Sequence, residues 1–462
     1  MASNSTIPTE LGTEKIGRLL KQYALPAIIA MTASSLYNMV DSIFIGQGVG
    51  PLAISGLAVT FPLMNLSTAF GTLVGAGAAT MLSVLLGQKN YKAANKVLGN
   101  VVSLNIIIGL IFMAVSLIFI DPILYFFGAS ENTLPYAKEY MKIILYGNII
   151  THLYFGLNAA MRSSGSPKKA MGLTIFTVIF NTILDPIFIF VFDMGIAGAA
   201  WATVIAQTIA MFIVLHHFNN KEMAFHFEKG IVRLDRRVAK DSLAIGLGPF
   251  LMNAAACLVT LFINQQMRTY GGDLGIGAFG ICNRFIFMFI MICMGLNQGM
   301  QPIAGYNYGA RQYGRVREVF WKTAGLATIV TSICFIIGMA CPRAACGIFT
   351  HDEELLGLSA EGLRHISIMF PVVGFQMIGT NFFQSLGMVK KSIFLSLSRQ
   401  ILFLLPLIYA LPKWIGTKGV WLSFPVSDLI AAALTAILLA DLFRQFNKLN
   451  DGDDSSVLGS RI

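Results

Sequence analysis

The chain has 462 residues, of which 55% are hydrophobic and only 12% are charged, and its formal net charge is +10. A soluble globular domain carries about 25% charged residues, so this composition excludes an ordinary soluble domain and predicts a polytopic membrane protein. The N-terminal stretch 1–20 is polar and charged, without the apolar run and small-residue cleavage site of a signal peptide, so we expect no cleaved leader.

Twelve apolar segments follow one another along the chain. A helix needs about 20 residues to cross roughly 30 Å of hydrocarbon, and each segment reaches this length. Several contain Gly or Pro, which favours tilted and kinked helices over additional spans. In chain order, we expect an all-α membrane fold with transmembrane helices over 18–46, 52–86, 94–120, 136–161, 168–192, 195–218, 239–269, 274–308, 316–340, 358–385, 390–411 and 417–443.

Basic residues are distributed unequally between the two sides that these segments define. The side that holds both chain ends carries 24 of the 33 Lys and Arg residues, and the opposite side carries seven. Arg284 and Arg399 lie inside helices. Because Lys and Arg accumulate in cytoplasmic loops, we expect both termini in the cytoplasm. The positive net charge then reflects membrane topology, and nucleic acid is not an expected partner.

The two halves of the chain repeat each other. The stretch "GQKNYKAANKV" from Gly87 resembles "GARQYGRVREV" from Gly309, and "GSPKK" from Gly165 resembles "GMVKK" from Gly387 with the same spacing between the copies, which we call the repeat offset. Six helices per half make the repeats parallel, as in many alternating-access transporters. We therefore expect two pseudo-symmetric six-helix bundles, with bounds of 1–218 for the N-terminal bundle, 219–238 for a cytoplasmic linker, 239–443 for the C-terminal bundle and 444–462 for a cytoplasmic tail.

The first apolar segment contains Asp41, although a carboxylate at the centre of a membrane costs roughly 2.5–3.5 kcal/mol. At 1.5 Å of rise per residue, Asp41 lies roughly 8–10 Å from the outer end of its helix, and Asp185 and Thr203 lie roughly 12 Å from theirs. Residues three or four positions apart share a helix face, so Asn181 accompanies Asp185 and Tyr37 accompanies Asp41. These side chains can meet at one level in the outer half of the N-terminal bundle.

The repeat provides a comparison within the chain. Asp41 lies 15 residues after Pro26, and Asn264 lies 15 residues after the matching Pro249, so Asn264 replaces Asp41 in the second half. At the repeat offset, Phe403 replaces Asn181 and Leu407 replaces Asp185. Because the acids occur in one half alone, a function is favoured over a contact that the fold requires. Such a group of carboxyl, amide and hydroxyl oxygens can bind a proton or Na⁺. The alternative is a pair of protonated structural acids bonded to Asn side chains.

The second half has charged residues of its own. Arg399 in the segment 390–411 and Asp428 in the segment 417–443 lie near mid-depth by residue count. We expect them to form an ion pair, because an unpaired charge at this depth is costly. A structural role and a role in gating both remain open for this pair.

Motifs of other protein classes are missing from the sequence. The stretch "GTLVGAG" at 71–77 is not followed by Lys-Ser/Thr, so it indicates close helix packing rather than a phosphate loop. GxSxG and HExxH are absent, and we expect neither an enzyme nor ATP-driven transport by this chain alone. The six cysteines show no metal-ligand spacing. Free thiols are the favoured interpretation, with a bond between Cys341 and Cys346 as the alternative.

Several stretches resemble the multidrug and toxic compound extrusion (MATE) family, and the resemblance covers nearly the whole chain. They include "LPAIIAMTASSLYNMVDSIFIGQG", "FQSLGMVKKSIFLSLSRQ" and "GVWLSFPVSD". "NTILDP" with "GIAGAAWAT" is the most specific combination and resembles the DinF-like, MepA-like bacterial branch. In that branch, an Asp on helix 1, an Asn and an Asp on helix 5 and a Thr on helix 6 couple cation movement to transport. They correspond to Asp41, Asn181, Asp185 and Thr203.

The resemblance implies further site residues. A Tyr and an Asn on helix 4 belong to the N-lobe cavity of the family and correspond to Tyr140 and Asn158. Asn158 fits the outer level poorly, because it lies only four residues before Arg162. Tyr37 is expected to line the same substrate cavity. The family's proline on helix 1, which is linked to bending of that helix, corresponds to Pro26.

The resemblance implies a secondary multidrug efflux transporter of the bacterial inner membrane, with two bundles around a V-shaped cleft. It would export hydrophobic, often cationic, drug-like compounds by antiport with H⁺ or Na⁺. We expect a monomer in the lipid bilayer, with no cofactor and no metal beyond Na⁺ at the Asp41 and Asp185 site. Helix 7 has Asn264 and Gln265 where the NorM-like branch has an acid, which argues against NorM-type coupling. The alternative is a lipid or lipid-linked oligosaccharide flippase of the same superfamily.

Overall fold

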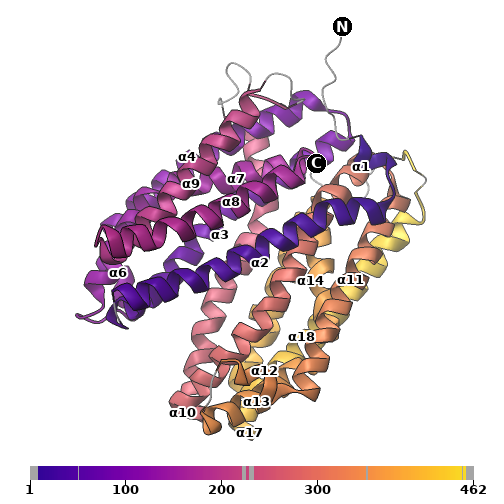
Figure 1. Ribbon diagram of the computed structural model, residues 1–462. Helices are drawn as coiled ribbons and strands as arrows, with labels where there is room; N and C mark the ends of the chain where they lie inside the picture. Colours follow the sequence, from indigo (N-terminus) through magenta and orange to yellow (C-terminus); the bar gives the residue numbers. More distant parts are fainter. Residues whose placement is uncertain are drawn as a thin grey trace. The chain divides into compact units, whose positions relative to one another are not determined.

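Figure 1 shows the computed structural model of the chain, which describes residues 9–49, 51–220, 225–227, 234–349, 352–449 and 451–453. All regular elements within these ranges are helices. The backbone of Tyr37, a predicted cavity residue, belongs to a helix, but its side chain lies outside the described part of the molecule. The predicted all-α fold is confirmed for the described chain.

The first half of the chain forms nine α-helices and one π-helical segment within the described ranges. Their bounds are α1 (Glu10–Thr13), α2 (Ile16–Gly48), α3 (Pro51–Gly87), α4 (Tyr91–Ile118), α5 (Ile120–Phe126), α6 (Leu134–Tyr146), α7 (Asn148–Ser163), α8 (Pro167–Pro186), η1 (Ile187–Val191) and α9 (Gly195–Asn219). Gly147, between α6 and α7, leaves room for α9, because a Cβ at this position would lie 2.6 Å from Val204 Cγ2.

The described part of the second half repeats this pattern after one long element. The bounds are α10 (Arg236–Gly309), α11 (Tyr313–Ala340), α12 (Pro342–Gly347), α13 (Glu353–Ser367), α14 (Phe370–Ser385), α15 (Val389–Leu397), η2 (Ser398–Leu404), α16 (Leu405–Ala410), α17 (Pro412–Ile415) and α18 (Thr417–Phe446). Gly272 has a φ of 63° and divides α10 into two helices, Arg236–Gly272 and Leu274–Gly309.

Most of these helices have the length and composition of membrane spans. Within the described ranges, nine helices are long and apolar enough to cross a membrane. The pair α13 and α14, which is bent by 56°, passes the same test of length and composition when it is counted as one segment. Helix α2 and the pair α6 and α7 occupy the two remaining predicted segments. Each of the twelve predicted segments is therefore helical in the structure.

The helix bounds repeat at the offset predicted from the sequence. α4 begins at Tyr91 and α11 begins at Tyr313, which is the repeat offset, and both helices contain 28 residues. The backbone before them repeats as well, since Lys89 has a φ of 59° and Arg311 a φ of 58°. A left-handed conformation is uncommon for residues other than glycine. Its recurrence at equivalent positions shows that the two halves share detailed backbone geometry, and the pseudo-symmetric fold is confirmed.

The chain separates into two compact units whose boundaries pass through two helices. The first unit consists mainly of Ile29–Phe250, and the second consists of Glu14–Ile28 together with the residues from Leu251 on. The beginning of α2 thus belongs to the second unit, and the beginning of α10 belongs to the first. The predicted bounds describe the sequence repeats, in which each helix belongs whole to its own repeat, and they remain a prediction.

The beginnings of α2 and α10 each belong to the unit formed mainly by the other repeat, so we call them the exchanged helix beginnings. Glycines allow them to pack closely. In the second unit, a Cβ at Gly299 would lie 2.5 Å from the backbone nitrogen of Ala24. In the first unit, a Cβ at Gly77 would overlap the carbonyl group of Ser242. Gly77 and Gly299 are related by the repeat offset, so equivalent glycines seat the exchanged helix in both units. Small residues of this kind let membrane helices approach each other closely.

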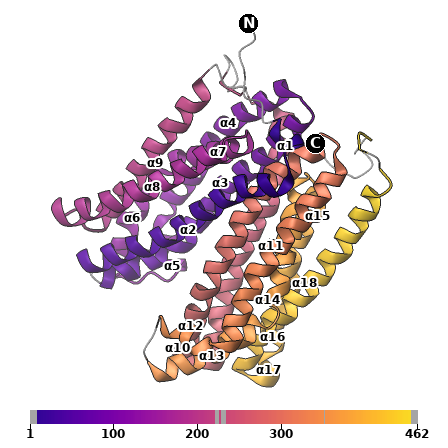
Figure 2. The same cartoon turned by 45° about the vertical axis from the view of Figure 1, so that its right-hand side comes forward.

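The first unit has an apolar cluster next to the predicted acids. Ile45 and Ile189 each follow one of the acids, Asp41 and Asp185, by four residues, and both belong to this cluster together with Tyr140. Figures 1 and 2 show α4, α7, α8 and α9 of this unit side by side. The acids therefore lie on helices whose neighbouring turns are fixed by packing.

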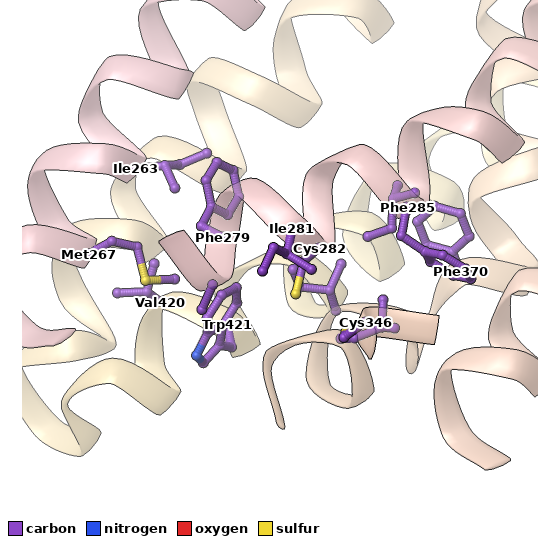
Figure 3. Packing of buried hydrophobic residues seen from close by; sticks show 14 of the residues in the cluster. Ile263, Met267, Phe279, Ile281, Cys282, Phe285, Cys346, Phe370, Val420 and Trp421 are labelled. Carbon is purple, nitrogen blue, oxygen red and sulfur yellow. The ribbon is translucent and has the colours of Figure 1, made fainter. Parts of the chain in front are cut away.

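The second unit has its own apolar cluster, part of which Figure 3 shows. The rings of Phe279 on α10 and Trp421 on α18 have centroids 6.4 Å apart, and such aromatic pairs contribute about 1 kcal/mol beyond burial. Cys282 and Cys346 are buried in this cluster, whereas Cys341 is exposed. All six cysteines are free thiols, so the alternative bond between Cys341 and Cys346 is not present.

Candidate functional site

Three of the predicted coupling residues form one hydrogen-bonded group in the first unit. Asn181 and Asp185 are buried on α8, and Thr203 lies opposite them on α9. With its amide oriented to match its neighbours, Asn181 donates to Asp185 Oδ2 at 3.0 Å. Its carbonyl oxygen accepts from the backbone N–H of Thr203 at 2.9 Å and from the hydroxyl at 3.1 Å. The amide of Asn181 thus fixes the carboxyl group of Asp185 relative to α9.

The backbone changes from an α-helix to a π-helix next to this group. α8 ends at Pro186, and the π-helical segment η1 begins at Ile187. Proline lacks an N–H donor, so it cannot make the hydrogen bond that would continue an α-helix. Short π-helical segments of this kind occur often at functional sites. The sequence Asp-Pro therefore places the acid where the helix loses its regular geometry.

Asp41 and Tyr140 complete the group from α2 and α6. Both side chains are buried, with exposures of 5% for Asp41 and 1% for Tyr140. Asp185 interacts electrostatically with Asp41, and Tyr140 interacts electrostatically with both acids. Among the residues that the structure describes, Oδ1 of Asp41 and Oδ1 of Asp185 are buried and have no hydrogen-bond partner.

This group of side chains can bind a proton or a small cation. Two neighbouring buried carboxyl groups cannot both stay charged without a compensating cation, because desolvation and mutual repulsion oppose this state. A proton can bind to either acid, and carboxyl, amide and hydroxyl oxygens are also ligands for small hard cations. Buried oxygens without partners are rare in proteins and call for an explanation such as an ion or a catalytic role. A cation bound here would provide one.

The charged residues predicted in the second half also meet. Arg399 Nε donates to Asp428 Oδ1 at 2.6 Å, where the Arg399 side chain is 24% exposed and that of Asp428 is 2% exposed. Arg399 belongs to the π-helical segment η2, and Asp428 belongs to α18. Both repeats therefore carry a π-helical segment in their fifth helix, but the polar chemistry beside it differs.

The remaining predicted residues lie elsewhere in their units. Asn158 Nδ2 donates to the carbonyl of Ala170 at 3.2 Å. Ala170 and Asp185 lie on the same continuous helix α8, about 22 Å apart along its axis. Asn158 is therefore not part of the acid group, in line with its poor fit to the outer level. Pro26 lies inside α2, two residues before the chain passes from the second unit to the first.

A second polar group on α7 was not singled out from the sequence. The hydroxyl of Tyr154 lies 3.4 Å from the hydroxyls of both Thr174 and Thr177. Tyr154 also interacts electrostatically with Arg162. A comparison of the two halves at the repeat offset identifies this group, because Gln376 stands in place of Tyr154 and the aromatic hydroxyl is lost.

Comparisons with known sequences point to one family. The family model MatE matches residues 26–187 and again 246–410, so it covers most of both repeats. The multidrug export protein MepA of Staphylococcus haemolyticus is 26% identical over 427 residues, which cover 92% of this chain and 94% of the relative. MepA of Staphylococcus aureus strain MSSA476 is 27% identical over 428 residues with the same coverage.

Solved structures share the fold. A MATE structure in the bent conformation matches with a TM-score of 0.91 at 22% identity, over 96% of this chain and 99% of the other. An outward-facing multidrug resistance MATE family transporter of the MOP superfamily matches with a TM-score of 0.90 at 22% identity, over 96% and 100%. The family model matches both repeats of a chain whose fold agrees with these structures, so the chain belongs to the multidrug and toxic compound extrusion (MATE) family.

Proposed function

We propose that this protein is a secondary multidrug efflux transporter of the bacterial inner membrane. It exports hydrophobic, often cationic, organic compounds and takes up H⁺ or Na⁺ in exchange. Its relatives named MepA are multidrug export proteins, and two parallel repeats are a common architecture for alternating access. The excess of Lys and Arg on the side of the chain ends supports a cytoplasmic location for both termini.

The observation that carries the proposal is the buried group around Asp41 and Asp185. Its partners Asn181 and Thr203 fix one acid, while Oδ1 of each acid has no hydrogen-bond partner in the described part of the chain. A bound proton or Na⁺ satisfies these oxygens and changes the charge of the first unit. This change in charge is the event that can be linked to drug movement.

Exchange requires that the cation and the drug favour different conformations, because a ligand shifts an equilibrium only by its differential affinity. Helix α2 is suited to connect the two events. It contains Asp41 in the first unit and Pro26 near the passage into the second. A proline inside a helix removes one backbone hydrogen bond and is a common cause of bending. We assign the conformational change that follows cation binding to the part of α2 between Pro26 and Asp41.

The test uses purified protein in proteoliposomes with ethidium as a fluorescent lipophilic cation. A pH gradient and a Na⁺ gradient are imposed separately, and export is followed by fluorescence. We expect one of the gradients to drive transport. Asp41→Asn and Asp185→Asn should each lower ion-driven export by roughly 5- to 150-fold, the range of typical coupling free energies.

Two results would contradict the proposal. One is export that neither gradient drives, and the other is unchanged ion-driven export in both Asn variants. Movement of fluorescent lipid between the leaflets, in the absence of ethidium export, would support the flippase alternative instead. Correct folding of each variant is checked by size-exclusion chromatography in detergent.

A further inference from the structure

A face of α8 connects the acid group to the opposite end of the first unit. Thr174, Thr177, Asn181 and Asp185 are three or four residues apart, so they share one face of the helix. This face is directed at α7 and α9, which both pack against α8. The hydroxyl groups of Thr174 and Thr177 therefore lie on the same side of α8 as the carboxyl group of Asp185, nearer to the beginning of the helix.

α7 and α9 contribute polar side chains to the same line. Thr151 on α7 donates to the side chain of Gln207 on α9, which lies one helical turn beyond Thr203. Tyr154 on α7 lies one turn beyond Thr151 and contacts the hydroxyls on α8. We call this line the inner polar seam, and it consists of Thr203, Gln207, Thr151, Thr177, Tyr154 and Thr174.

Arg162 lies at the end of the seam that is far from the acids. Tyr154, Asn158 and Arg162 are four residues apart on α7 and share a face. Asn158 contacts Ala170, about 22 Å along α8 from Asp185, so Arg162 lies beyond this level. Its Nε atom is buried, and it interacts electrostatically with Tyr154. A guanidinium group thus stands where the seam approaches the cytoplasmic loop.

The second repeat keeps only part of this polar line and has no guanidinium group at the position of Arg162. Ser396 and Arg399 stand in place of Thr174 and Thr177, and Arg399 is paired with Asp428. Val373, Pro425 and Leu429 stand in place of Thr151, Thr203 and Gln207. Gln376 and Gln384 stand in place of Tyr154 and Arg162, although the helix ends match at both positions. Arg162 is therefore not required by the shared backbone geometry. It occurs in the repeat that also has the acids and the seam.

We propose that Arg162 is an electrostatic barrier that prevents cations bound at Asp41 and Asp185 from leaking to the cytoplasm along the inner polar seam. This inference rests on the proposed function. Fixed positive charges exclude protons and cations from polar pathways in membranes. Two unit charges about 5 Å apart, at an effective dielectric constant of about 20, repel each other enough to slow passage by roughly 100-fold. Without such a barrier, the ion gradient would dissipate without drug export.

The test measures ion leak in the absence of drug. Proteoliposomes contain a trapped pH-sensitive dye, or receive ²²Na⁺ outside, according to the gradient that drives wild-type export. Arg162→Gln should raise the leak by roughly 10- to 100-fold over wild type, because the barrier charge is lost. Arg162→Met keeps the aliphatic stem and should leak as well. Arg162→Lys keeps the charge and should remain close to wild type.

Two controls separate this mechanism from a damaged fold. Gln384→Ala changes the equivalent position of the second repeat and should not leak. Arg162→Gln combined with Asp185→Asn should return to the wild-type leak, because the leak starts at the acid group. A leak that persists in the double variant overturns the inference, and so does folded Arg162→Gln and Arg162→Met protein that leaks no faster than wild type. If neither ion gradient drives export by the wild-type protein, the proposed function itself is overturned.

Discussion

The two repeats share a backbone and differ in chemistry. α7 and α14 begin and end at positions related by the repeat offset, as do α4 and α11, and even the left-handed residues Lys89 and Arg311 correspond. Yet the first repeat buries two acids where the second has an amide and a leucine. The fold therefore tolerates both sets of side chains, so the acids are not needed to form it. Their presence in one repeat alone is best explained by the function of that repeat.

The most direct test of this difference between the repeats replaces Asp41 of the first repeat by the residue type that the second repeat has. Asp41→Asn places an amide where Asn264 stands in the other repeat. Ion-driven drug export should fall by roughly 5- to 150-fold, because a neutral amide takes up no proton and attracts a cation weakly. Transport in proteoliposomes measures the effect. Asn264→Ala should change export little, and an equal loss in both variants would contradict a function confined to the first repeat.

A large effect on stability, rather than on transport, should come from the ion pair of the second repeat. Asp428→Asn leaves the guanidinium group of Arg399 without its charged partner, which typically costs about 3–5 kcal/mol for a buried pair. Thermal unfolding in detergent should show a clear loss of stability. The combined change Arg399→Met and Asp428→Leu should recover most of it. If Asp428→Asn is as stable as wild type, the pair does not stabilise the second unit.

Where the repeats agree, paired substitutions should have matched effects. Gly77→Ala and Gly299→Ala each add a Cβ that overlaps the backbone of an exchanged helix, so each should destabilise the protein by about 1–3 kcal/mol. Gly325→Ala on α11 is the control, because no atom lies within 4 Å of its Cβ position. Thermal unfolding measures all three. A loss in only one of the paired variants would show that the exchanged contacts are not equivalent.

The smallest effect concerns the loop before α10. Lys96 donates to Asp235 Oδ2 at 3.1 Å, and this hydrogen bond holds the pKa of Asp235 below its usual value, with help from the amide of Val238. The second repeat has Glu318 at the position of Lys96, and its Arg315 donates to the backbone carbonyl of Glu14 at 2.6 Å, which does not titrate.

A carboxyl group with a lowered pKa in the folded state stabilises the fold above its unfolded pKa of about 3.9, and this contribution is lost as the pH falls through the folded value. Asp235→Asn should therefore lower the melting temperature slightly at pH 7 and not at pH 3. An equal change at both pH values would show that the charge of Asp235 is not involved.

Much of the fold can be predicted from the sequence, because a membrane restricts the solutions. Apolar segments of about 20 residues must be helical to satisfy their backbone groups, so the twelve segments follow from segment length. The contact between Asn181, Asp185 and Thr203 follows from helical spacing and depth. Neither the break at Gly147 nor the π-helical segments can be predicted in this way, because local backbone geometry depends on packing against neighbouring helices.

Other features escape prediction for a different reason. Apolar patterning does not determine which bundle a helix packs against, so the exchange of the beginnings of α2 and α10 is visible only in the structure. Arg162 is one of several Lys and Arg residues that indicate membrane topology. The burial of its Nε atom and its interaction with Tyr154 separate it from them, and the repeat comparison then identifies both residues as particular to the first half.

The exchange of helix beginnings has a consequence for how the protein is made. The beginning of α2 is synthesised first, but its close contact with Gly299 becomes available only when the second half of the chain has been inserted. The first unit likewise lacks the beginning of α10 until translation passes the linker. Neither repeat contains all the helix segments of one unit, so each unit is completed only when both repeats have been synthesised. The arrangement is that of a domain-swapped dimer whose two subunits have become one polypeptide.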